Sequence, residues 1–307
     1  MSRVMCFIRV LSPKAPGLFL PVAALLVFST FLFTPVPVRA DDRELRVAFI
    51  PLENPEKLIN NVKPAMNFLE KEMGRKVRYF ITLNYSAAVE AMISKKADVS
   101  FMSPLPYVLA NKYSGVEAVL GEIYDGKPYY YSRIFVRKDS GIKEISDLKG
   151  RTIAYVDPIS SSGFMYPQDI FVRAGLVNGG VEKPEGKFFR RVYFAGGDQQ
   201  AVNSVVGGFV NAAGVSQYAL NLLRPDQRDQ VVAIAQSARI PSHNVVVRKG
   251  LEPEIRRKFI AAMLKMNRPE NRNMIRSLYG TDGYVRVNHN RYKPVVDMAR
   301  KYGFLKE

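Results

Sequence analysis

The chain of 307 residues contains a single cysteine, Cys6. Cys6 lies before the apolar part of the amino terminus, whereas a lipid-anchored bacterial protein carries its cysteine just after such a stretch. The position therefore argues against a lipoprotein. Once the amino-terminal segment is removed, the remaining chain has no cysteine, so it needs no disulfide in an oxidising compartment.

Histidine is almost as scarce, with only His243 and His289. A metal site built from these two is disfavoured because neither has a cysteine or a close histidine partner. We expect His243 on a crossing strand, packed or on the surface. The phosphate loop Gly-x-x-x-x-Gly-Lys, the elbow Gly-x-Ser-x-Gly and the zinc motif His-Glu-x-x-His are all missing. We therefore expect no catalytic residue, no metal and no cofactor.

The first forty residues contain no acidic residue and four basic ones. No charge occurs from Ala15 to Val38, and Val38-Arg39-Ala40 ends the segment with small residues at the positions that a signal peptidase prefers. We predict that residues 1–40 are a signal peptide, cleaved after Ala40. An uncleaved membrane anchor is the alternative, because the uncharged span is long enough to cross a bilayer. No second such span follows Asp41.

Acidic residues are fewer than basic ones, which gives the whole chain a net charge of +17 and residues 41–307 a net charge of +13. So positive a protein suggests an anionic partner. Secretion argues against nucleic acid. The basic pairs, such as Arg137-Lys138 and Arg190-Arg191, are also scattered and have no aromatic residues between them, as expected of a solvated surface.

Strand and helix patterns alternate along residues 41–307, as in a parallel sheet covered by helices on both faces. Strands are expected at 45–50, 76–82, 98–102, 117–120, 129–136, 151–156, 188–194, 209–213, 230–235 and 245–247. Helices are expected at 61–73, from 84, 104–113, 164–175, 198–206, 215–223 and after Pro253. We predict an α/β protein with lobe 1 formed by 41–133 plus 242–307 and lobe 2 by 134–241.

The stretch from Arg151 to Pro167 is the most distinctive in the sequence. A short strand ends at Asp157-Pro158, and Ser160, Ser161, Ser162 and Gly163 then lead into a helix. The open start of a helix carries unpaired N–H groups and partial positive charge, which suits an anion. The alternative is an ordinary serine N-cap with solvent-facing neighbours.

Several segments resemble one family. They are Tyr85-Ser86-Ala87-Ala88-Val89-Glu90-Ala91-Met92, Ala97-Asp98-Val99, Ser103-Pro104-Leu105-Pro106-Tyr107, the serine stretch with Pro167, and the run from Ile240 to Arg248. Together they resemble the phosphate/phosphite/phosphonate-binding proteins of bacterial ABC importers. This resemblance implies a type 2 periplasmic-binding-protein fold, in which two α/β lobes are joined by two crossover strands and close on a ligand in the cleft between them.

The resemblance also implies a set of ligand-binding residues: Tyr85, Ser103, Tyr107, Tyr130, Ser160, Ser161, Ser162, Gly163, Asp198 and Asn211. The family's histidine falls at Asp198 and its acid at Asn211, so this chain departs from the pattern at both. A carboxylate about 4 Å from a dianion costs around 4 kcal/mol at an effective dielectric constant of 20. Either Asp198 points away, or the ligand is zwitterionic or is not a phosphonate.

We therefore expect a periplasmic, monomeric receptor that binds a small oxyanion or zwitterion and delivers it to an inner-membrane ABC permease. Two alternatives remain. A sensor of the same fold would pass the ligand state to a membrane receptor, and an enzyme on this fold would need a catalytic cluster that the sequence does not show.

Overall fold

The computed structural model describes residues 44–178, 180 and 184–305. The predicted signal peptide, 1–40, and its cleavage site lie outside the described residues. None of the helices in the described part of the chain is long and apolar enough to cross a membrane.

The first sheet has six strands in the order β13-β4-β12-β3-β1-β2. The strands are β1 (Glu44–Phe49), β2 (Lys76–Ile81), β3 (Val99–Met102), β4 (Glu117–Ile123), β12 (Asn244–Val247) and β13 (Gly283–Arg286). β1 is parallel to β2 and β3, whereas β12 is antiparallel to both of its neighbours, β3 and β4. A strand from late in the chain thus lies between two early ones.

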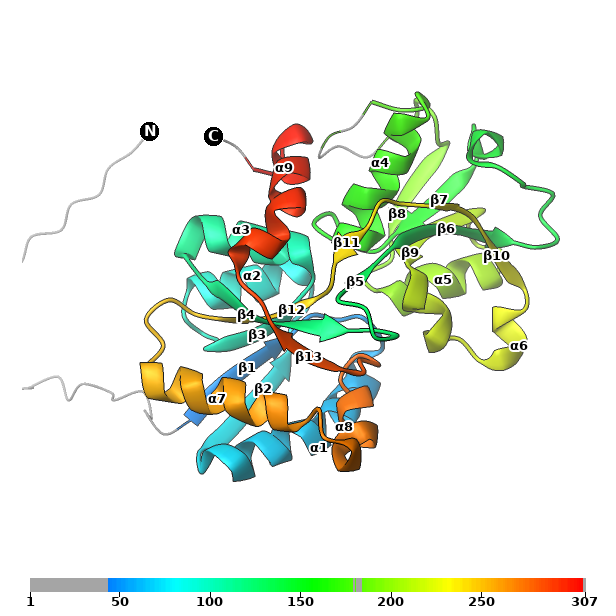
Figure 1. The fold of residues 1–307 in the computed structure, drawn as a ribbon. Coiled ribbons are helices and arrows are strands. Elements are labelled where there is room, and N and C mark those ends of the chain that lie inside the picture. Colours follow the sequence, from blue (N-terminus) through cyan, green and yellow to red (C-terminus); the bar gives the residue numbers. More distant parts are fainter. Residues whose placement is uncertain (1–43, 179, 181–183, 306–307) are drawn as a thin grey trace, which may run out of the picture. The chain divides into compact units, whose positions relative to one another are not determined.

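Helices cover both faces of this sheet (Figure 1). Val47 and Phe49 of β1 pack in one core with α1 (Pro55–Met73) and α7 (Pro253–Lys265), while Ala48, between them, packs in the other core with α2 (Tyr85–Ile93) and α3 (Pro104–Ser114). This alternation is what an extended strand buried on both faces requires. The remaining helical segments here are η4 (Pro269–Asn271), α8 (Arg272–Arg276), η5 (His289–Tyr292) and α9 (Lys293–Lys301).

The second sheet has five strands in the order β10-β6-β9-β7-β8. The strands are β6 (Ser132–Arg137), β7 (Thr152–Tyr155), β8 (Arg191–Phe194), β9 (Ala212–Ser216) and β10 (Val231–Gln236). The helical segments are η1 (Ile145–Leu148), η2 (Ser161–Met165), α4 (Tyr166–Arg173), α5 (Asp198–Val206), η3 (Gln217–Leu222) and α6 (Pro225–Arg228). β8, β7 and β9 are parallel, so their carboxyl ends meet at one edge.

Two short strands connect the sheets. β5 (Tyr129–Tyr130) pairs antiparallel with β11 (Ile240–Pro241), through Tyr130 with Ile240 and Tyr129 with Pro241. The strand predicted at 129–136 is therefore wrong as one element, because the chain leaves β5 at Tyr131 and enters the second sheet as β6. The expected pair of extended crossings is present.

Further local predictions need correction, and one strand was missed. The helix predicted at 215–223 is a 3-10 segment at Gln217–Leu222, because residues 215 and 216 belong to β9. The helix predicted at 61–73 begins earlier, at Pro55, because the side chain of Asn54 accepts hydrogen bonds from the N–H groups of Glu56 and Lys57 and caps the helix there. The strand predicted at 209–213 is β9, three residues later, since a turn after α5 leaves Phe209 exposed. β13 was not predicted.

Candidate functional site

The serine loop, residues 157–163, follows β7 and is buried throughout except at Pro158 and Ile159. Oγ of Ser160 accepts a hydrogen bond of 3.0 Å from the N–H of Gly163 and so caps the π-helical turn η2. Ser161 and Ser162 are buried, so the solvent-facing neighbours that the ordinary N-cap alternative expects are not found. Position 163 admits only glycine, because a Cβ there would lie 2.3 Å from Cβ of Val156. The tight turn holds the loop against its own strand.

The loop contacts the starts of two helices that pack on the first sheet. The N–H of Leu105, in the first turn of α3, donates to Oγ of Ser161 over 2.7 Å. The N–H of Tyr85, the first residue of α2, donates to Oδ2 of Asp157 over 3.3 Å. Burial raises the pKa of the Asp157 carboxyl. Main-chain donors that lack a partner within their own helices thus converge from two helix starts on one loop of the other sheet, which accepts from both.

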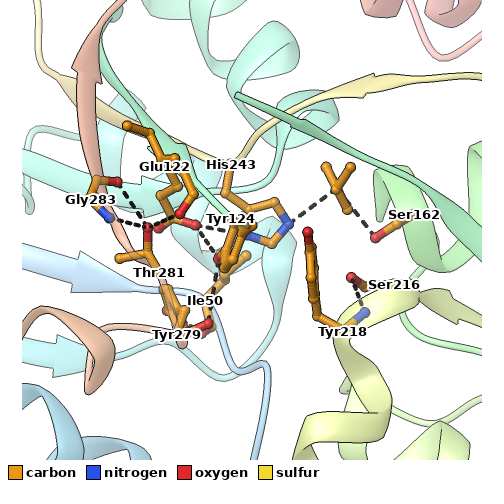
Figure 2. Close-up of polar contacts among 12 residues, drawn as sticks. Ile50, Glu122, Tyr124, Ser162, Ser216, Tyr218, His243, Tyr279, Thr281 and Gly283 are labelled. Carbon is orange, nitrogen blue, oxygen red and sulfur yellow. Dashed lines mark hydrogen bonds and ion pairs between the residues drawn. The ribbon is translucent and has the colours of Figure 1, made fainter. Parts of the chain in front are cut away.

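Tyr130 connects this loop to a pocket. Its hydroxyl donates to Oγ of Ser162 over 3.3 Å and lies 3.1 Å from Nε2 of His243. The loop is held from behind by Ser132, whose Oγ donates to the carbonyl of Ser162 over 2.6 Å. Figure 2 shows the row of polar groups that runs from Glu122 past His243 towards Ser162.

The pocket has a volume of about 210 Å³ and is lined from both sheets. Four of its side chains are tyrosines, and two are carboxylates. Its lining residues are Leu52, Glu53, Lys57, Asn61, Tyr124, Tyr130, Asp198, Ser216, Tyr218, Ala219, Asn221, Leu222, His243, Arg276, Ser277, Tyr279 and Gly280. Two of the tyrosine rings of the pocket wall stack on each other with their centroids 4.7 Å apart. Tyr124 follows β4 of the first sheet, and Tyr218 follows β9 of the second sheet. The pocket is therefore an amphipathic space between the two halves of the molecule.

Asp198 begins α5 and points into this pocket. Its Oδ1 accepts a hydrogen bond of 2.9 Å from the N–H of Ser216, at the carboxyl end of β9. Burial raises the pKa of Asp198 to about 6, although this hydrogen bond opposes the rise. The other pocket carboxylate, Glu53, forms an ion pair of 2.8 Å with Lys57. Asp198 is thus the carboxylate of this wall that has no cationic partner among the described residues.

A buried polar pair lies behind Tyr130. Burial raises the pKa of Glu122 to about 8, and Glu122 accepts a short hydrogen bond from the hydroxyl of Tyr124. Burial lowers the pKa of His243 to about 4. Nδ1 of His243 lies 3.9 Å from Oε2 of Glu122, beyond hydrogen-bond distance. Burial therefore favours the uncharged form of both side chains, in which they act through hydrogen bonding and not through charge.

Eight of the ten predicted site residues lie at or beside this junction. Tyr130 and Asp198 line the pocket, and Ser160 to Gly163 form the loop that Tyr130 contacts. Tyr85 is the first residue of α2, and its N–H donates a hydrogen bond to Asp157 of the loop. Ser103 precedes α3, and its buried Oγ has no hydrogen-bond partner among the described residues.

The structure places the other two elsewhere. Tyr107 is buried under the carboxyl-terminal part of the chain, where its hydroxyl lies 2.8 Å from Nδ1 of His289 and its ring packs on Tyr292. Oδ1 of Asn211 accepts from both the N–H and Oγ1 of Thr152 at 3.0 Å. This is the amino end of the parallel strands β7 and β9, whereas the pocket lies at their carboxyl end. Asn211 therefore holds the start of β7 and does not line the pocket.

Sequence reasoning missed several pocket residues. Ser216 follows directly from the rule that ligands gather at the carboxyl ends of parallel strands, once β9 is placed correctly. Glu122 lies on β4 and His243 directly precedes β12, and the N–H of Glu122 donates to the carbonyl of His243. This pairing cannot be seen in one sequence. Tyr279, with φ of 57°, sits in a turn that no sequence pattern indicated.

Comparison with known proteins gives consistent results. Residues 47–292 match the model of a family described as the periplasmic substrate-binding protein of ABC phosphonate transporters. The chain is 28% identical over 219 residues to the phosphate-import protein PhnD of Mycolicibacterium smegmatis, covering 69% of this chain and 68% of the relative. It is 27% identical over 248 residues to the phosphonates-binding periplasmic protein of Escherichia coli, covering 75% and 69%.

Solved structures show the same fold. A binding protein of an ABC phosphonate transporter from Pseudomonas aeruginosa superimposes with a TM-score of 0.77 at 19% identity, covering 86% of this chain and 87% of that one. PhnD1 of Prochlorococcus marinus in complex with methylphosphonate gives a TM-score of 0.76 at 19% identity, covering 86% and 100%. The predicted type 2 two-lobe fold is confirmed.

Proposed function

This chain belongs to the family of periplasmic substrate-binding proteins of ABC phosphonate transporters, and we propose that it binds a small solute with an oxyanion group at the serine loop. As in its family, the chain binds its ligand and releases it without chemical change. The solute then passes to an ABC permease in the inner membrane.

The convergence of helix starts on the serine loop carries this proposal. The donors at Tyr85 and Leu105 are bonded to Asp157 and to Ser161 of the loop. An oxyanion is a stronger acceptor than a neutral hydroxyl, so it competes well with Ser161 for the N–H of Leu105. The dipoles of α2 and α3 favour the same negative charge. The unpartnered Oγ of Ser103, at the start of α3, supplies one more hydroxyl.

The pocket beside the loop supports a solute that carries a substituent on its oxyanion group. About 210 Å³ of space adjoins Tyr130, and its walls carry tyrosine rings and the carboxylate of Asp198. Negative charge here repels a second anionic group and attracts a cation. A zwitterionic phosphonate, with its anion at the loop and its cation near Asp198, fits this arrangement better than a bare dianion.

Closure of two lobes is the expected mode of binding. We take lobe 1 as 41–133 plus 242–307 and lobe 2 as 134–241, with β5 and β11 as the crossings. The N–H of Gln199, at the start of α5, contacts the carbonyl of Leu52 over 3.4 Å, which is a contact between the two lobes. We further propose that the mature protein begins at Asp41 and is a monomer.

Isothermal titration calorimetry with methylphosphonate, 2-aminoethylphosphonate, phosphate, phosphite and methanesulfonate tests the ligand class. We expect the aminophosphonate to bind most tightly. The variant Asp198→Asn should weaken its binding about tenfold and strengthen that of phosphate, because the substitution removes one negative charge from the pocket wall. Asp226→Asn, on exposed α6, is the matched control. If no compound binds, or if Asp198→Asn leaves both affinities unchanged, the proposal fails.

A further inference from the structure

His243 and Tyr130 join the two crossings between the sheets. Tyr130 lies on β5, and His243 lies between β11 and β12. Nε2 of His243 is 3.1 Å from the tyrosine hydroxyl, and the two rings meet edge to face with centroids 5.1 Å apart. His243 is 6% exposed and Tyr130 1% exposed, so water does not replace this contact. The pair is a fixed part of the pocket wall.

Two orientations of the hydrogen bonds satisfy the same distances, because a hydroxyl can both donate and accept. In the orientation in which Tyr130 donates its one proton to Oγ of Ser162, its oxygen accepts from His243, whereas the reverse orientation leaves the imidazole proton on Nδ1. The first orientation places the single proton of the neutral imidazole on Nε2. Nδ1 is then a bare acceptor, and it has no hydrogen-bond partner within the described residues. A bare buried acceptor costs less than an orphaned N–H, which favours the first orientation.

The groups around the imidazole leave this assignment in place. Oε2 of Glu122, on β4, lies 3.9 Å from Nδ1 and is already bonded to Tyr124. Asp198, on α5, faces Tyr130 from the other sheet, where its Oδ1 is held by the N–H of Ser216. No hydrogen bond to Nδ1 comes from any of these groups.

We propose that His243 is a specificity-determining positioning residue, which orients a chain of donors from its Nε2–H through Tyr130 to Ser162. Because Oγ of Ser162 accepts from Tyr130, its own proton is left to donate to the ligand. The inference rests on the proposed oxyanion site. His243 itself touches no ligand atom in this scheme and acts through Tyr130.

This orientation determines which ligand oxygens fit. A series of hydrogen bonds that ends in a donor at Ser162 matches an unprotonated ligand oxygen, as in a phosphonate dianion or a sulfonate. The opposite orientation would leave Ser162 an acceptor and would select a protonated P–OH group. Hydroxyls in a chain also polarise one another, so the first donor strengthens the last.

Nuclear magnetic resonance of the unaltered protein tests the tautomer without any variant. A long-range ¹H–¹⁵N spectrum of the histidine side chains should show His243 protonated on Nε2 only. Protonation on Nδ1 would overturn the inference, because Tyr130 would then have to donate to His243.

Calorimetry on variants tests the effect on binding, with methylphosphonate as the probe at one neutral pH. His243→Met removes the donor at similar volume and should weaken binding about tenfold. His243→Gln restores an N–H donor, so it should stay within about threefold of wild type. In a Tyr130→Phe background, His243→Met should add almost nothing, because the residue acts through that hydroxyl.

Equal losses in both backgrounds, or no rescue by glutamine, would mean that His243 is merely structural. Circular dichroism and urea unfolding identify any variant that fails to fold, in which case the tautomer measurement decides. If no compound of the panel binds even the wild-type protein, the proposed function fails, and not this inference alone.

Discussion

The main-chain N–H of Leu105 donates a hydrogen bond of 2.7 Å to Oγ of Ser161, although the two residues are 56 positions apart and belong to elements of different sheets. Leu105 lies in the first turn of α3, where main-chain donors have no partner within the helix. The bond therefore caps a helix of one lobe with a side chain of the other. It couples the contact between the lobes to the site at which we expect the ligand oxyanion.

Replacing Ser161 by alanine should show this coupling. The variant leaves the Leu105 N–H without its acceptor and removes one hydroxyl from the loop. We expect methylphosphonate affinity to fall about tenfold and the free energy of unfolding to fall by about 1 kcal/mol. Calorimetry and urea denaturation measure the two effects. Ser114→Ala, at the other end of α3, is the control and should leave affinity unchanged. Wild-type affinity in Ser161→Ala would contradict the site assignment.

Asp198 should make stability depend on pH in a particular direction. Burial raises its pKa from an ordinary value of 3.8 to about 6. The folded protein then holds the proton more tightly than the unfolded chain, so the stabilisation is complete below pH 3.8 and is lost as the pH rises through 6. Asp198→Asn cannot ionise. It should gain up to about 3 kcal/mol relative to wild type between about pH 4 and pH 7.5.

Urea denaturation of both proteins at several pH values measures this difference. Asp226→Asn, an exposed position, should run parallel to wild type over the same interval. A constant gap between Asp198→Asn and wild type would show that the carboxyl titrates normally.

The carboxyl of Asp98 should make the stability change with pH in the opposite direction to that of Asp198. Burial would raise its pKa, but hydrogen bonds from Arg46 and Arg248 outweigh burial and hold the pKa of Asp98 below its ordinary value. Its stabilising effect is therefore present above the ordinary pKa and is lost as the pH falls through the lower, folded value. Asp98→Asn should cost about 2 kcal/mol at neutral pH, and less in acid. The measurement is the urea midpoint at each pH, and equal losses at pH 7 and pH 3 would refute it.

Tyr302 should stabilise the packing of the last helix. Its hydroxyl donates to Oδ1 of buried Asp169 over 2.5 Å, which ties the end of α9 to α4 of the second sheet. Tyr302→Phe removes that bond while Arg173 keeps Oδ2 of Asp169 paired. We expect a loss of about 2 kcal/mol in the free energy of unfolding. Tyr113→Phe, at a position 61% exposed, should lose almost nothing. Equal stability of the two variants would show that the bond is unimportant.

Local patterns in the sequence predicted most of the fold. The helix predicted at 198–206 matches α5 residue for residue, and proline and capping residues located the starts of α3 and α7. Errors occurred where tertiary contacts, and not the local sequence, determine where an element begins. β9 begins at Ala212 because its register with β7 starts there, and the side chain of Asn211 is used to hold Thr152.

The residues of the site also fall into those that local patterns predict and those that depend on tertiary contacts. The serine loop and Asp198 follow strand ends and helix starts, so their positions could be predicted along the chain. Glu122 and His243 meet only because β12 pairs with β4, more than a hundred residues away. Their burial, and hence the shift of both pKa values towards the uncharged forms, depends on that pairing. No local pattern contains this information.

The position of β12 has a consequence for export. An exported chain emerges amino end first, so β3 and β4 appear long before residues 244–247, the strand that must separate them. Until then each offers an unsatisfied edge, and direct pairing of β3 with β4 would block the correct arrangement. A polypeptide ending before residue 240 should therefore leave its first sheet open between β3 and β4 and be readily degraded there, whereas one that includes β12 can fill that gap.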